Sequence, residues 1–127
     1  MKTGYFAKLK EYEEAGYTPV SISRFKPPFF KGLEYKKVAP SADLLHAYKY
    51  GKFKNDFAGY ITKYMDGIAQ MKATEVVKEL EELTKVKEDR IILLCYEKPD
   101  NYCHRHYLAS WLRTFGDIEC KEYDYDK

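Results

Sequence analysis

The sequence of 127 residues lacks long apolar runs, has only three cysteines and carries little net charge. No stretch approaches the roughly 20 apolar residues that a membrane-spanning helix requires, and the first residues do not resemble a secretory signal. Three cysteines are an odd number without the spacing of a disulfide framework, so we expect reduced thiols. These absences favour a cytoplasmic protein that does not contact a membrane.

The formal net charge of +2 is too small to indicate nucleic-acid binding by itself, but the charge is unevenly distributed. Residues 24–64 contain nine Lys or Arg against three acidic residues, and tyrosines alternate with lysines in Tyr48–Lys54 (YKYGKFK). Tyrosine rings can stack on bases while lysines contact phosphates. The same composition suits an ordinary solvated surface, on which both side chains keep their polar ends in water. Both interpretations stay open.

The chain is long enough to bury one core, and we expect a single α/β domain over residues 1–127. The unbroken apolar run in 90–96 predicts a strand that is covered on both faces. Other strands are expected at 18–24, 33–38 and 117–123. Helical spacing predicts helices at 41–51, 55–67, 74–84 and 102–115. Residues 5–14 suit a short strand or a helix, and the paired prolines make 25–32 a loop.

This order of elements, with right-handed crossovers, predicts a small three-layer domain with a mostly parallel central sheet flanked by helices. Side chains that can accept from free N–H groups mark the helix starts: Ser41, Thr74, and Asp100 or Asn101. Glycines mark the helix ends: Gly16, Gly51 and Gly116.

The junction between the 90–96 strand and the 102–115 helix carries the most reactive side chains. The strand ends at Cys95, and Cys103, His104 and Arg105 open the helix. In a parallel sheet this junction lies at the carboxyl edge, where ligands usually bind. Helical spacing from the apolar stripe of Tyr107, Leu108, Trp111, Leu112 and Phe115 points Cys103 and His104 toward the sheet, with Arg105 to one side.

The chemistry of this junction favours anions and thiolates. A thiol in the first helical turn is stabilised as thiolate by free N–H groups and by a neighbouring cation. The same N–H groups and a guanidinium can hold a phosphate or carboxylate. Glu97 follows the strand into the same space, and Arg24 joins it if the 18–24 and 90–96 strands are neighbours.

Two functional hypotheses use these residues directly. In the first, Cys103 is a catalytic nucleophile, His104 or Glu97 is the acid or base, and Arg24, Cys95 and Arg105 bind the ligand. In the second, the pocket binds a phosphate or nucleotide without covalent chemistry. The loop of cysteine phosphatases, C-x5-R, is absent from both cysteines.

Two further hypotheses assign the cysteines no catalytic role. Cys95, Cys103, His104 and His106 could bind zinc, but Cys103 and His104 are adjacent and no C-x-x-C pair is present, so we expect no metal or other cofactor. Alternatively Cys103 is a small core residue, and His104 and Arg105 pair with Glu97 or Asp100. Cys120 is expected as a strand residue and His46 as a surface or boundary residue.

Three segments carry a resemblance to a known family: SISRFKPPFF, VAPSADLLHAYKYGKFKNDFAGYITKYM and LLCYEKPDNYCHRHYLASWL. They resemble segments of the domain of unknown function 488 family, and the resemblance spans about Thr18–Tyr123. The resemblance implies an α/β fold and a site at Arg24, Cys95, Glu97, Cys103, His104 and Arg105. It supplies no reaction, and the aromatic, lysine-rich region Phe25–Tyr64 departs from typical members.

The sequence therefore predicts an anion- or phosphate-binding pocket with a reactive cysteine. Its partner would be a nucleotide or another phosphorylated small molecule, and the protein could be an enzyme that acts on it. The alternatives are a nucleic-acid-binding module that uses the Lys/Tyr-rich surface of residues 24–64, or a Cys/His structural site without catalysis.

Overall fold

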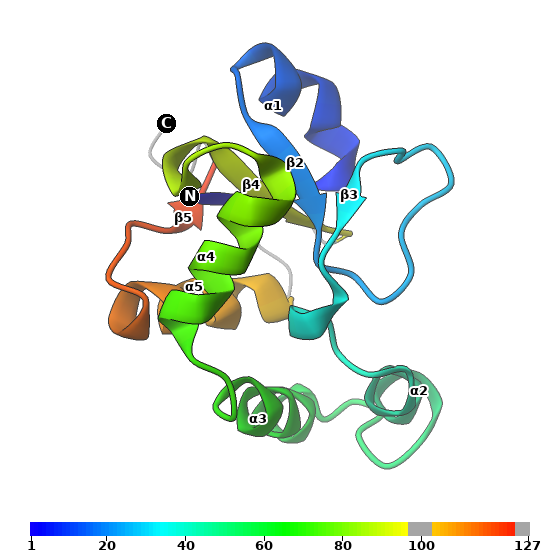
Figure 1. Cartoon of the computed structure of the whole chain (residues 1–127). Helices are drawn as coiled ribbons and strands as arrows, with labels where there is room; N and C mark the ends of the chain where they lie inside the picture. The colour runs from blue at the N-terminus through cyan, green and yellow to red at the C-terminus, as the bar shows by residue number, and fades with distance from the viewer. Residues whose placement is uncertain (97–102, 124–127) are drawn as a thin grey trace.

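A five-stranded parallel sheet forms the centre of the protein, in the strand order β3-β2-β4-β1-β5 (Figure 1). The computed structural model describes residues 1–96 and 103–123. The strands are β1 (Lys2–Tyr5), β2 (Thr18–Ser21), β3 (Leu33–Glu34), β4 (Ile91–Cys95) and β5 (Lys121–Glu122). Every residue of β4 is buried, as the unbroken apolar run predicts for a strand with neighbours on both faces.

Helices cover both faces of this sheet, which confirms the predicted three-layer α/β architecture. The α-helices are α1 (Leu9–Glu14), α2 (Ala42–Tyr50), α3 (Phe57–Ile68), α4 (Ala73–Thr84) and α5 (His104–Phe115). Three 3₁₀ turns complete the described elements: η1 (Phe6–Lys8), η2 (Lys36–Val38) and η3 (Glu88–Arg90). Alternate residues of β4 separate the two cores: Leu93 packs with α3, α4 and α5, while Leu94 packs with Phe6, Tyr12 and Phe30.

The pairing of β2 with β4 positions the site. Ser21 lies opposite Leu94, and the Ile22 N–H continues the ladder by donating to the Leu94 carbonyl at 3.0 Å. The segment after β2 therefore lies beside the segment after β4. This confirms the expected adjacency of the 18–24 and 90–96 strands, on which the placement of Arg24 depends.

Several predicted boundaries are wrong or shifted. Residues 5–14 are neither one strand nor one helix, because β1 ends at Tyr5 and α1 follows. The Thr74 cap is wrong: α4 begins at Ala73, and Lys72 at the N-cap makes no side-chain bond. The 55–67 helix begins after Asp56, whose Oδ1 accepts from the Gly59 N–H at 3.0 Å. The 33–38 and 117–123 strands are shorter than expected.

The predicted N-cap of α2 is confirmed, whereas the N-cap position of α5 is occupied by a residue that was not predicted there. Ser41 caps α2 as predicted, since its Oγ accepts from the Leu44 N–H at 3.1 Å. Cys103 occupies the N-cap position of α5, and the candidate caps Asp100 and Asn101 lie outside the described residues. The predicted apolar stripe also changes, because Tyr107 and Phe115 are exposed. The buried face of α5 consists of His104, Arg105, Leu108, Ala109, Trp111 and Leu112.

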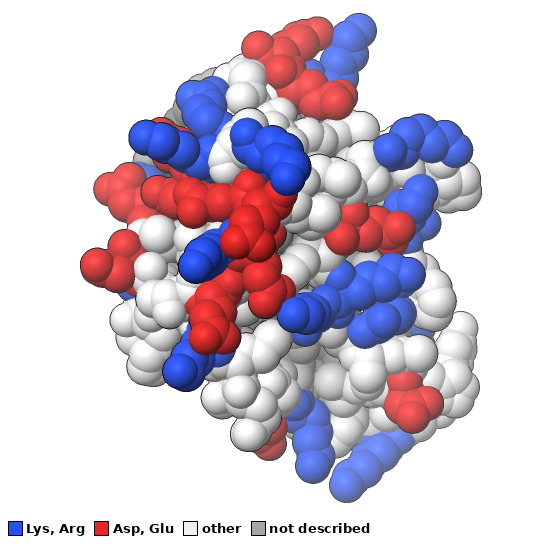
Figure 2. Space-filling view, in the orientation of Figure 1, with Lys and Arg blue, Asp and Glu red and all other residues white. Residues whose placement is uncertain are grey.

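The surface carries separated patches of charge. Acidic side chains gather over α4, with lysines beside them (Figure 2). Glu79 of α4 accepts from the Tyr35 hydroxyl at 2.7 Å and from Lys37 at 2.9 Å. Lys37, one of the basic residues of 24–64, is therefore paired with an acidic side chain of α4. Among the described residues, no helix is both long and apolar enough to cross a membrane.

Candidate functional site

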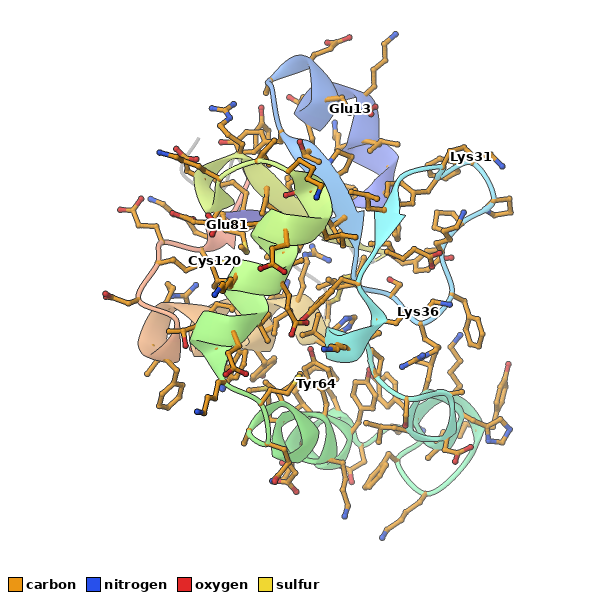
Figure 3. All side chains as sticks on the ribbon, in the orientation of Figure 1. Glu13, Lys31, Lys36, Tyr64, Glu81 and Cys120 are labelled. Carbon is orange, nitrogen blue, oxygen red and sulfur yellow. A yellow bond between two sulfur atoms is a disulfide. The ribbon has the colours of Figure 1, made fainter. Side chains whose placement is uncertain are left out.

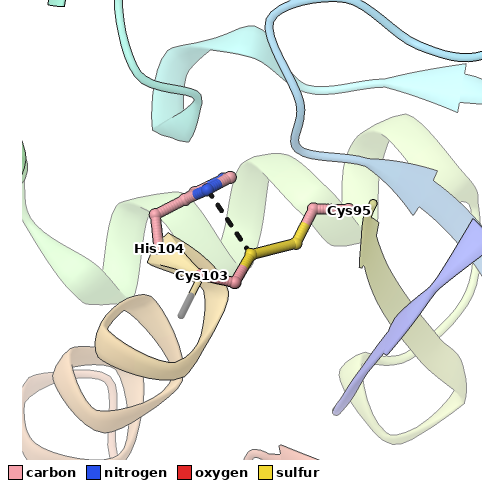
Figure 4. Close-up of side chains that lie close together, drawn as sticks. All are labelled: Cys95, Cys103 and His104. Carbon is pink, nitrogen blue, oxygen red and sulfur yellow. Dashed lines mark hydrogen bonds between the residues drawn. A yellow bond between two sulfur atoms is a disulfide. The ribbon is translucent and has the colours of Figure 1, made fainter. Parts of the chain in front are cut away.

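A disulfide joins Cys95, the last residue of β4, to Cys103, the residue before α5 (Figure 4). The expectation of reduced thiols is therefore corrected for these two residues. The odd number of cysteines and their irregular spacing in the sequence give no information on how close two sulfur atoms lie in the fold. The carboxyl end of β4 and the start of α5 meet at one edge of the sheet, which brings the two sulfur atoms together. Among the cysteines only Cys120 is free.

His104 lies beside the disulfide, and its two ring nitrogens have different partners. Its Nε2 is 2.9 Å from the Ile22 carbonyl oxygen, and its Nδ1 is 3.8 Å from Cys103 Sγ. A carbonyl only accepts, so Nε2 carries the hydrogen and Nδ1 presents its lone pair to the sulfur. Burial lowers the pKa of His104 to about 4, and the nearby Arg105 and His106 charges act in the same direction. The imidazole is thus neutral at pH 7.

Arg105 is fully buried and holds an internal carboxylate. Its Nε and Nη2 donate to the two oxygens of Glu122, each at 3.0 Å. Thr3 completes the group by donating its hydroxyl to Glu122 Oε1 at 2.7 Å. The remaining Nη1 donates to Cys95 Sγ at 3.0 Å. The Arg105 side chain therefore points into the protein. The anion that it binds is the Glu122 carboxylate of β5, whereas the sequence suggested a bound ligand.

Glu122 is the partner of Arg105 that the sequence reasoning missed. Its signal was the alternation of Ile118, Cys120 and Glu122 through the last segment, which places an acid on the same face as a buried cysteine. A buried arginine requires such an acid. The partners suggested instead, Glu97 and Asp100, lie outside the described residues, so the predicted acid/base role of Glu97 keeps the status of a prediction.

Arg24 lies at the mouth of the site, after β2. Its Nε donates to the Pro40 carbonyl at 3.0 Å, and its Nη2 lies 3.4 Å from the Lys36 carbonyl. The guanidinium therefore fastens the segment that leads into α2 against the end of β2. This contact explains how a residue far from α2 in sequence comes to line the same cavity.

A cavity of about 390 Å³ opens over the disulfide, between the ends of β2 and β4 and the helices α2 and α3. Its walls are largely aromatic, with Tyr48 stacked on Tyr60 at 4.3 Å between ring centroids. The lining residues are Ser23, Arg24, Phe25, Pro40, Leu45, Tyr48, Lys49, Phe57, Tyr60, Cys95, Tyr96, Cys103 and His104. Tyr48 and Lys49 of α2 were predicted only as part of the Lys/Tyr-rich surface of residues 24–64, and the structure places them beside the Cys-His segment.

The remaining candidate residues lie elsewhere. His46 is exposed on α2, as expected, with its ring against Tyr50. Cys120 is completely buried before β5 rather than within a strand, and burial raises its pKa to about 11. His106 Nδ1 lies 4.0 Å from Glu122 Oε1, and His106 does not join the cluster of Cys95, Cys103 and His104 found among the described residues.

Tyr64 connects the site to the core beneath it. The side chain points from α3 into the protein (Figure 3), and its hydroxyl donates to the Val38 carbonyl at 2.6 Å. Its ring meets the His104 ring at 5.2 Å in an edge-on contact. Burial raises the pKa of Tyr64 well above its usual value, so the hydroxyl stays protonated. This contact and the Ile22 carbonyl fix the orientation of the imidazole.

The sheet and the Cys-His-Arg segment define a parallel α/β protein with a sulfur and imidazole site at the edge where such folds bind ligands. Residues 18–116 match a family model described as "Active DUF488-N3 subclade". The match covers more than half of the chain, and the protein belongs to this domain of unknown function 488 family. No curated protein and no solved structure matches the chain. Glu122, which pairs with Arg105, and Thr3, which donates to Glu122, lie outside the matched range.

The state of the thiols can be measured directly. Without reductant, one of the three cysteines should react with a thiol reagent in denaturant, and all three should react after reduction. In the folded protein the Cys120 reaction should be slow at pH 7, because the thiol is buried and its pKa is about 11. Cys120→Ser is the control and should leave no reactive thiol before reduction. Three reactive thiols without reductant would contradict the disulfide.

Proposed function

We propose that the cavity binds a nucleotide or a similar phosphorylated small molecule that carries a planar ring. The observation behind this proposal is that a cavity of about 390 Å³ has aromatic walls and includes two basic side chains, Arg24 and Lys49. Pockets for small molecules usually measure about 300–1,000 Å³ and combine apolar walls with a few polar groups. The cavity is therefore of a size that suits a small ligand.

The lining divides by chemistry into two parts. Phe25, Tyr48 and Tyr96 supply ring faces, on which a planar base can stack for about 1–3 kcal/mol. Arg24 and Lys49 supply positive charge for a phosphate, and the guanidinium can donate to it in a fork. Arg105 does not serve this purpose in the proposal, because Glu122 already neutralises it.

The sulfur atoms and the imidazole form another part of the lining. While the disulfide is closed, Cys103 Sγ is bonded to Cys95 and cannot act as the nucleophile that the sequence suggested. Any chemistry of this thiol therefore requires reduction first. Ligand binding by the aromatic and basic groups does not require it.

Calorimetric titration with adenosine 5′-monophosphate tests the proposal. Lys49→Gln is expected to weaken binding about 5- to 10-fold, which corresponds to about 1 kcal/mol for a partly exposed charged contact. Lys52→Gln is the matched control, since Lys52 is exposed and does not line the cavity. Equal weakening by both substitutions, or no measurable binding by the wild type, would contradict the proposal.

The same variants separate this function from nucleic-acid binding. A surface that binds a nucleic acid through Lys49, Lys52 and Lys54 should bind an oligonucleotide with strong salt dependence. Replacing any one of the three lysines by Gln should then lower the affinity by a similar factor. The cavity proposal instead expects a selective effect of Lys49. A salt-dependent oligonucleotide complex that all three substitutions weaken equally would favour the nucleic-acid alternative.

A further inference from the structure

We propose that, after reduction of the disulfide, Cys95 Sγ, Cys103 Sγ and His104 Nδ1 bind one Zn²⁺ ion. These three atoms all lie within 4.8 Å of one another, and all three residues are buried (Figure 4). Two thiolates and an imidazole are a ligand set that zinc prefers. The inference concerns these side chains alone and holds whichever small molecule enters the cavity.

The spacing of the ligand atoms agrees with tetrahedral coordination. Zinc lies about 2.3 Å from sulfur and about 2.0–2.1 Å from nitrogen, so the two ligand atoms should be about 3.5 Å apart. Cys103 Sγ and His104 Nδ1 are 3.8 Å apart. Reduction frees the two sulfur atoms to separate to about 3.8 Å, the distance between two thiolates on one zinc ion.

The backbone explains why adjacent residues can share one ion. Cys103 has an extended conformation (φ −154°, ψ 143°), whereas His104 is the first residue of α5. This change of conformation lets both side chains reach the end of β4: Cys103 is bonded to Cys95, and His104 Nδ1 lies 3.8 Å from Cys103 Sγ. The adjacency that counted against zinc in the sequence is therefore no obstacle.

The imidazole has the orientation of a metal ligand. Metal-binding histidines usually donate their other ring N–H to a carbonyl or carboxylate, which fixes the tautomer. His104 Nε2 does so to the Ile22 carbonyl at 2.9 Å, and the Tyr64 ring contacts the imidazole from the side. Nδ1 consequently presents a lone pair to the sulfur atoms, and no proton has to be removed from it.

Charge balance favours a dithiolate–zinc group in this buried place. Two thiolates neutralise Zn²⁺, and Arg105 is neutralised by Glu122 through a bidentate contact. Arg105 Nη1 donates to Cys95 Sγ at 3.0 Å and would stabilise that sulfur as thiolate. The whole buried group then carries no net charge, which avoids the cost of an uncompensated buried ion.

Three protein ligands leave one coordination position for water or a ligand, as in catalytic zinc sites. Cys95, Cys103 and His104 all line the cavity, so water or a small ligand in the cavity would have access to the ion. The reaction that loads the site is balanced. An external dithiol supplies two electrons and two protons to the disulfide and is itself oxidised, and Zn²⁺ then displaces the two thiol protons into water.

Titration of the reduced full-length chain with Co²⁺ tests the site, because thiolate-bound tetrahedral Co²⁺ absorbs at characteristic wavelengths. We expect one equivalent to bind with a sulfur-to-cobalt charge-transfer band and to be displaced by Zn²⁺. Cys95→Ser and Cys103→Ser should weaken binding by more than about 100-fold, since substituting even a residue that only hydrogen-bonds to a metal ligand usually costs about 10- to 100-fold. Cys120→Ser is the matched control and should bind as the wild type does.

A comparison that needs no substitution guards against misfolded variants. The oxidised wild type should show no charge-transfer band, and reduction should create it. A reduced wild type without the band would overturn the inference, as would a band that survives Cys103→Ser. Nucleotide titration of the metal-free protein is a separate measurement, so its failure and the failure of metal binding can be told apart.

Discussion

Replacing Arg105 by Met is expected to lower the free energy of unfolding by about 3–5 kcal/mol, because the change leaves a buried carboxylate without its partner. The Arg105 side chain is fully buried, and that of Glu122 is only 6 % exposed. Arg105 joins α5 to β5 through Glu122 and to the end of β4 through Cys95. Urea unfolding of the oxidised protein, followed by circular dichroism, measures the loss.

Two further variants show whether the loss comes from the buried charge. Arg105→Met combined with Glu122→Gln should be less destabilised than Arg105→Met alone, since the double change removes both charges. Arg90→Met is the control, because Arg90 is exposed and donates to the Ala15 and Gly16 carbonyls. If Arg105→Met and Arg90→Met cost the same, the buried pair does not stabilise the fold as argued.

The sequence was sufficient where a pattern has one physical solution. The five apolar residues of β4 needed cover on both faces, and the structure buries all of them. Ser41 could be identified as a cap because its role depends only on the next three residues. The parallel arrangement followed from alternating strands and helices, whereas the adjacency of β2 and β4 was only a condition for placing Arg24, and the structure meets it.

β1 was harder to predict from the sequence because its stability comes from contacts with residues far away in the chain. Its sequence, KTGY, contains no aliphatic residue to signal a strand beside β4. Gly4 is required because a Cβ there would lie 2.6 Å from the Tyr12 ring. Thr3 can be buried because its hydroxyl donates to Glu122, 119 residues away. No local pattern contains that contact.

The sequence predicted where the candidate site lies in the fold, but not which residues contact one another there. Local spacing put Cys103 and His104 at the sheet edge, where the structure has them buried. It could not show that Cys103 meets Cys95, because that depends on how the chain returns to the end of β4. It also could not show that α2 brings Tyr48 and Lys49 over the same place, since this follows from tertiary packing.

The oxidised protein is expected to lose about 3 kcal/mol of stability through His104 as the pH falls from 6.5 to about 4. The unfolded His104 has a pKa of 6.5, whereas burial lowers the folded pKa to about 4. Between these values the unfolded chain binds a proton that the folded protein does not, so stability falls with falling pH. Above pH 6.5 the contribution is complete, and below pH 4 no further loss arises from this residue. The size follows from about 1.4 kcal/mol per pKa unit.

Comparison with two substituted proteins isolates this effect from carboxylates that also titrate in acid, such as Glu79, whose pKa is lowered by its hydrogen bonds to Lys37 and Tyr35. Unfolding free energies are measured by urea at several pH values in the presence of a chelator, so that no metal ion occupies the imidazole. His104→Gln should flatten the slope between pH 6.5 and 4, whereas His46→Gln should keep it, because the His46 ring is exposed. Equal slopes in the wild type and His104→Gln would show that the buried imidazole becomes charged in the folded protein. Its Nδ1 would then be a proton donor rather than the lone pair that both the neutral tautomer and a metal ligand require.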